Sequence, residues 1–176
     1  MSKIKFISVL FLLVSMFGYG QTKEIDSLKA ELLKPALTDT TKIKLYSEIT
    51  EKYYHISNDS VGKYSDLALR LARSSTELFL GRAYNNKGIY HLGNRQKDSA
   101  QYYFKKTIKI GETIKDTLFI AKGYANYETT LSEVSDFEEK VVIGLKVIEL
   151  LKNDKYQLAE SQYNLSVTYA NAEYDS

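Results

Sequence analysis

The chain has 176 residues, with no cysteine, one proline, and 24 basic against 22 acidic residues. The lack of cysteine excludes disulfide bonds and thiol chemistry, so packing alone must hold the fold together. The nearly balanced charge argues against nucleic-acid binding, because proteins that bind phosphate backbones carry a clear basic excess.

Residues 1–20 are organised like a secretory signal peptide, with a basic start, an apolar stretch over residues 6–17, and small residues at Gly18 and Gly20. We expect cleavage before Gln21. A retained membrane anchor is the alternative, but crossing a bilayer takes about 20 apolar residues and this stretch is shorter. Lys3 and Lys5 lie in this segment, so its removal takes the formal charge from +2 to 0. The protein is therefore predicted to be exported, to the periplasm or cell envelope of a bacterium, without a membrane span in its mature part.

The rest of the chain predicts helices, because proline is rare and no run shows the period-two alternation of a strand. An N-terminal helix and linker are expected over residues 21–37, with the helix ending before Pro35. Helix-capping residues then recur at residues 39–41, 57–60, 116–117, 135–136 and 153–154. They predict helices to about residue 54, through residues 64–71, and over about 76–92, 97–114, 117–134 and 137–152, with a last helix after residue 154. Connections of a few residues make consecutive helices antiparallel hairpins.

A sequence repeat organises these helices. Residues 78–86 return forty residues later as residues 118–126, and residues 158–164 repeat residues 120–126 at an offset of 38. Further upstream the pattern is fainter, with Lys42 forty residues before Arg82. A fixed period in this range is typical of stacked repeat units. We therefore expect residues 38–176 to form a repeat array of three units and the first helix of a fourth, so that the array looks truncated after Ser176.

Small and aromatic residues stand where the two helices of a unit would cross. Gly88, Ala100 and Phe104 have this spacing in the second unit, and Leu165, Ser166 and Tyr169 have it in the last helix. In these positions the chain resembles the tetratricopeptide repeat (TPR) family from about Thr41 to Ser176. The resemblance implies an all-α, right-handed α-solenoid of antiparallel helix hairpins, in which small residues let helix axes approach to about 8–10 Å.

The resemblance is incomplete in two respects. Glu128, Lys140 and Gly144 replace the small and aromatic residues expected in the third unit, and the period of 38–40 exceeds the usual 34. HEAT-like or armadillo repeats, with periods nearer 40, are the structural alternative. The small-residue spacing of the second unit favours the TPR interpretation.

No motif for catalysis, cofactor binding or metal binding stands out. His55 and His91, each near a helix end, are too few for a zinc site. Adjacent Glu138 and Glu139 fit an acidic first helical turn, which the helix dipole favours. We interpret the basic stripe of Lys105, Lys106 and Lys109 as solvated surface, and most of the fifteen tyrosines as half-buried packing residues. The sequence thus predicts a protein that is not an enzyme and needs no cofactor.

The repeat itself supplies candidate binding residues. In TPR proteins the first helix of each unit lines a concave groove, and the resemblance places Arg82 with Asn86, Lys122 with Asn126, and Glu160 with Asn164 on that groove. Asparagine amides can bond both N–H and C=O groups of an extended peptide, and the cations can select carboxylates. The alternative is that the asparagines bond between helices or mark common descent of the units.

Two functions fit these features. The first is a non-enzymatic scaffold that binds a protein or peptide segment. The alternative is the N-terminal sensor region of a longer signal-transduction protein, because exported arrays of this kind resemble those that precede a membrane span and a histidine kinase or helix-turn-helix regulator in Bacteroidetes-type bacteria.

Overall fold

The computed structural model describes residues 23–132 and 135–174, and within these ranges all regular elements are helical. Residues 23–32 form a first helix. It is followed by α2 (Asp39–Tyr53), α3 (Asn58–Ala72), α4 (Glu77–Gly93), α5 (Lys97–Ile114), α6 (Thr117–Glu128), α7 (Phe137–Leu151) and α8 (Lys155–Tyr174). The predicted signal peptide and its cleavage site lie outside the described residues.

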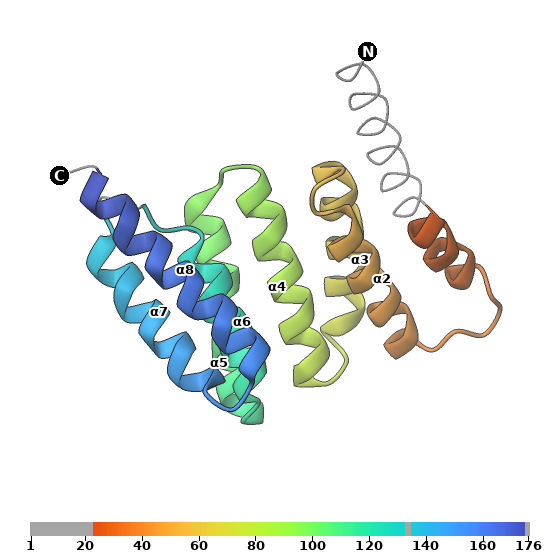
Figure 1. Cartoon of the computed structure of the whole chain (residues 1–176). Coiled ribbons are helices and arrows are strands. Elements are labelled where there is room, and N and C mark those ends of the chain that lie inside the picture. Colours follow the sequence, from red (N-terminus) through yellow and green to blue (C-terminus); the bar gives the residue numbers. More distant parts are fainter. Residues whose placement is uncertain (1–22, 133–134, 175–176) are drawn as a thin grey trace, which may run out of the picture.

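The helices form an α-solenoid. Each helix from α2 to α7 packs against the next one along the chain, and α2 and α8 lie towards opposite ends of the array (Figure 1). The first helices of the repeat units, α2, α4, α6 and α8, begin 38, 40 and 38 residues apart, and the second helices α3, α5 and α7 begin 39 and 40 residues apart. The predicted all-α solenoid with a period of about 38–40 residues is therefore confirmed.

Most helix starts follow from local side-chain chemistry. Ser57 Oγ accepts a hydrogen bond from the Ser60 amide at 3.3 Å, and Asp116 Oδ1 accepts one from the Phe119 amide at 2.9 Å. Asp154 Oδ1 accepts from the amides of residues 156 and 157, which lie in the first turn of α8. Each oxygen satisfies an amide that has no partner within its helix. The cap of α2 was misplaced by one residue, because Thr38 rather than Asp39 caps it.

The predicted extent of α6 was wrong. The helix ends at Glu128 instead of continuing to about Val134. Two hydroxyls explain the stop, since Thr129 Oγ1 donates to the Asn126 carbonyl and Thr130 Oγ1 to the Tyr127 carbonyl, both at 2.7 Å. Such bonds compete with the helical backbone pattern. Asp136, expected to cap α7 with its side chain, instead accepts from the Ser132 amide and from Lys97.

The core runs along the array and depends on close helix contacts. Phe104 and Ala100 in α5 are fully buried, and a Cβ added to Gly88 in α4 would overlap the Phe104 ring. This is the packing that the TPR resemblance implied for these residues. In the third unit, Gly144 of α7 faces Leu165 of α8, so a glycine at that position makes room for the next helix.

Candidate functional site

A pocket of about 800 Å³ lies along the first helices of the units and is lined by residues of α2, α4, α6, α7 and α8. All six residues predicted from the repeat line it, namely Arg82, Asn86, Lys122, Asn126, Glu160 and Asn164. The structure therefore brings together side chains that are up to 82 positions apart in the sequence, counting from Arg82 to Asn164. This volume falls in the range typical of ligand pockets, about 300–1,000 Å³.

The repeat register extends to α2, where sequence comparison had pointed to a different residue. With α2 and α4 starting 38 residues apart, Lys44 rather than Lys42 is equivalent to Arg82. Lys44 lines the pocket, whereas Lys42 lies 3.7 Å from Asp39 in an ion pair on its own helix. Lys44, Arg82 and Lys122 thus form a row of cations across three successive first helices, and Glu160 continues that row with the opposite charge.

The three predicted asparagines have three different environments. Asn126 Nδ2 donates to Asn85 Oδ1 at 2.6 Å and so links α6 to α4. Asn86 is 2% exposed, and its Nδ2 is a buried donor without an acceptor among the described residues. Asn164 is exposed on α8. The alternative that the asparagines bond between helices therefore holds for Asn126.

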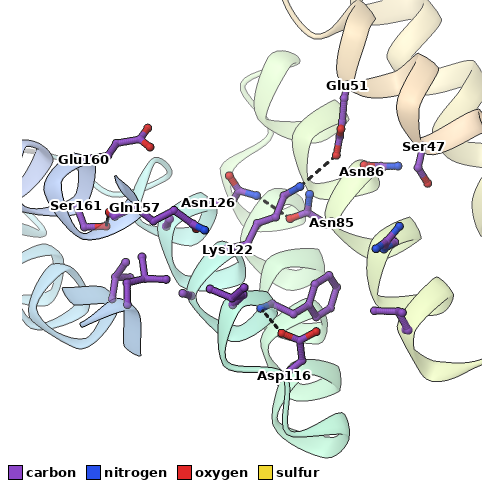
Figure 2. A pocket seen from close by; sticks show the side chains of 18 of the residues that line it. Ser47, Glu51, Asn85, Asn86, Asp116, Lys122, Asn126, Gln157, Glu160 and Ser161 are labelled. Atoms are coloured by element: carbon purple, nitrogen blue, oxygen red, sulfur yellow. Dashed lines mark hydrogen bonds and ion pairs between the residues drawn. The ribbon is translucent and has the colours of Figure 1, made fainter. Parts of the chain in front are cut away.

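A second buried polar atom lies beside Asn86. Ser47 Oγ on α2 also lacks a hydrogen-bond partner among the described residues, and its side chain lies near that of Asn86 (Figure 2). Both residues line the pocket. A buried polar group without a partner costs about 1–3 kcal/mol, so a polar group that reached this corner of the pocket would relieve that cost.

An ion pair lies in the lining of the pocket. Lys122 Nζ on α6 donates to Glu51 Oε1 on α2 at 3.1 Å, and each side chain is about half exposed, 50% and 51%. Helices α2 and α6 do not pack against each other, so this bridge reaches past α4. Figure 2 shows it next to the bond between Asn126 and Asn85.

The pocket also contains apolar side chains, although the lining residues of α8 are all polar. Helices α6 and α8 do not pack against each other, and between them the pocket is lined by Leu118, which is 50% exposed, and by Val147 and Leu151 of α7. The inter-unit amide bond is missing here, because the residue equivalent to Asn85 in α6 is Ala125, which offers no side-chain acceptor to Asn164. Val147 and Leu151 were not predicted from the sequence, because the TPR resemblance places the groove on first helices alone.

The other polar candidates have structural partners away from this pocket. Lys106 lies over the rings of Tyr84 and Tyr102, 4.9 and 4.5 Å from their centroids, and its hydrogen bond to Tyr102 raises its pKa. Burial, followed by a hydrogen bond to Glu139, raises the pKa of Tyr127 to about 12. The residues that line the pocket include no tyrosine.

The histidines do not line the pocket either. The His91 ring stacks on Tyr103 with centroids 5.3 Å apart, and His55 follows the end of α2 beside Tyr54. Over residues 23–132 and 135–174, no cluster of three potential metal-binding side chains occurs. Within the same ranges, none of the helices combines the length and apolar character that a membrane span requires.

Comparison with known proteins adds no family name. No protein-family model matches the chain. No curated protein matches it either. Function must therefore be inferred from the pocket itself.

Proposed function

We propose that this protein is a non-enzymatic, TPR-like scaffold that binds an extended peptide or protein segment along the pocket of its first helices. The supporting observation is the convergence of the six repeat-derived residues on one pocket. Binding proteins with stacked repeats use extended surfaces of this kind. In TPR proteins, which this chain resembles, ligands bind along the corresponding first helices.

The polar and apolar residues of the pocket lining favour a ligand with two kinds of side chain. Arg82 is exposed and has no hydrogen-bonded or ionic partner among the described residues, so it is available to a ligand carboxylate. Between α6 and α8, Leu118, Val147 and Leu151 favour an aliphatic side chain. An extended peptide can serve both, because it rises by about 3.3 Å per residue and its side chains alternate in direction. We therefore expect peptides that carry an acidic residue and, a few residues away, an aliphatic one.

A phage-displayed library of random nonapeptides, selected on the purified chain, tests the proposal. Selected peptides should lose about tenfold in affinity for the Arg82→Ala variant, the loss expected for a hydrogen bond to a charged group. Arg70→Ala is the matched control, because Arg70 is an exposed arginine on α3 that does not line the pocket.

Two further measurements accompany the selection. Ala125→Leu should weaken peptides with an aliphatic residue, because it fills the space between α6 and α8. Circular dichroism melts of each variant check that the fold is intact. Selected peptides that bind Arg82→Ala and Arg70→Ala equally well, or a selection that yields no binding peptide, would refute the proposed site.

The exported location and the role in signalling are proposals that rest on the sequence. N-terminal sequencing of the protein recovered from a bacterial periplasm should begin at Gln21, and a start at Met1 would refute the signal peptide. For the sensor role, the reading frame after Ser176 should encode an apolar span and a kinase or helix-turn-helix module. A stop codon directly after Ser176 would leave the scaffold as the only one of the two functions.

A further inference from the structure

We propose that Glu51 determines the ligand preference of the pocket by competing, within the free protein, for the cation that a ligand carboxylate must reach. This inference rests on the proposed function. It adds that binding of an acidic peptide exchanges the carboxylate of Glu51 for a carboxylate of the ligand at Lys122, whereas a ligand without an acidic group has no carboxylate to take its place.

The position of the bridge supports this exchange. Glu51 and Lys122 both line the pocket and join two helices that do not pack against each other. A segment that crosses the first helices from α8 to α2 meets the bridge next to the amides of Asn126 and Asn85 (Figure 2). Both side chains are about half exposed, so the bridge can open without unfolding a helix.

The cations beside the bridge give an acidic ligand several possible partners, although Glu48, Asp116 and Glu160 line the same pocket. Lys122 belongs to a row with Arg82 and Lys44, so a carboxylate that enters at Lys122 gains neighbouring cations on successive helices. Glu51 lies near the C-terminal end of α2, where the helix dipole disfavours a negative charge. Its carboxylate is therefore poorly compensated by its own helix and depends on Lys122.

The chain offers a matched control for this idea. Glu48 lines the same pocket, lies about one turn before Glu51 on α2, and has no hydrogen-bonded or ionic partner among the described residues. Glu48→Gln and Glu51→Gln thus remove the same charge from the same helix. Only the second change releases Lys122.

The experiment measures fluorescence anisotropy of a labelled nonapeptide of glycine, serine, one leucine and two glutamates, against a version with glutamines in place of the glutamates. Glu51→Gln should bind the acidic peptide about two- to fivefold more tightly than the wild type, the size expected for loss of one exposed ion pair. Glu48→Gln should give a smaller gain. The gain of Glu51→Gln should disappear when Lys122→Gln is added, and the glutamine peptide should bind no better to Glu51→Gln than to the wild type.

The contrary results overturn either the carboxylate exchange alone or the proposed function as well. Equal gains for Glu48→Gln and Glu51→Gln would show a general charge effect and overturn the exchange. A second result would also overturn the exchange: the acidic peptide binds neither the wild type nor Glu51→Gln, while library-selected peptides bind in an Arg82-dependent manner. In that case the proposed function would survive. If no peptide of any kind bound, both would fail.

Discussion

Replacing Gly88 by alanine tests whether close contact between α4 and α5 holds the second repeat unit together. A Cβ at this position would lie 2.5 Å from Phe104 Cδ1 and 2.9 Å from Cζ, well inside the about 3.5–4.0 Å that carbon atoms prefer. Phe104 is 0% exposed and packs in the core with Ala100 and Ile108, so its ring has little room to move.

Two opposing effects set the size of the change. Inserting a methyl group into a packed core costs about 1–3 kcal/mol, and overlap with several ring atoms places Gly88→Ala in the upper part of this range. Exchanging glycine for alanine in a helix returns about 1 kcal/mol. The free energy of unfolding should therefore fall by about 1–2 kcal/mol, which lowers the melting temperature by about 2–8 °C in a chain of this size.

Gly144→Ala is the matched control, because Gly144 is also a buried helical glycine. Its added Cβ would meet only a terminal methyl carbon of Leu165, at 3.0 Å, with the next atoms at 3.8 Å. That methyl group can rotate away, so helix propensity should prevail and Gly144→Ala should be neutral or stabilising by up to about 1 kcal/mol. Urea unfolding followed by circular dichroism measures both variants. If Gly88→Ala were as stable as Gly144→Ala, or if Phe104→Leu failed to reduce its cost, the packing argument would be wrong.

Two further changes probe polar groups. Asn126→Ala should lower the free energy of unfolding by about 1–3 kcal/mol, because buried Asn85 loses its hydrogen-bond partner. Asn164→Ala changes an exposed side chain and should alter the free energy of unfolding by less than about 0.5 kcal/mol. Similar urea midpoints for the two variants would contradict this contrast. Raising the pH from 10 to 12 should destabilise the protein. Burial and the hydrogen bond to Glu139 raise the pKa of the Tyr127 phenol from its ordinary 10.0 to about 12. In this pH interval the phenol ionises in the unfolded chain but not in the folded one, which favours unfolding. Below pH 10 this contribution is fully present. Tyr127→Phe should show a shallower loss of stability between pH 10 and 12, and parallel curves for the two proteins would exclude the explanation.

The sequence predicted most helix starts, but it misjudged one helix end and missed part of the pocket. Caps at Ser57, Asp116 and Asp154 could be predicted, because each involves an oxygen and an amide two or three residues away. The end of α6 was misjudged, because the hydroxyls of Thr129 and Thr130 compete for backbone carbonyls within an otherwise apolar and helical pattern.

The pocket, too, could be predicted only in part from the sequence. Its six predicted residues could be found, because the repeat conveys which helix positions are equivalent. The register of α2 could have been found from a tyrosine that recurs at Tyr46, Tyr84 and Tyr124, which fixes an offset of 38 before α4 and of 40 after it. Val147 and Leu151 could not, since they reach the pocket only because α6 and α8 are not packed together.

The recurring asparagine therefore has no single cause. In α6 it holds two units together through Asn85, and in α4 it is a buried amide whose donor has no acceptor in the described part of the chain. In α8, where Ala125 replaces the acceptor, the side chain of Asn164 is exposed. An asparagine bond between units needs an acceptor on the preceding first helix. Because α6 offers no such acceptor to α8, the Asn164 side chain forms no bond of this kind, and α6 and α8 are not packed together. Of the three asparagines, Asn164 thus contributes least to the fold and lies beside the apolar residues of the pocket. Its replacement can therefore change ligand binding without changing stability.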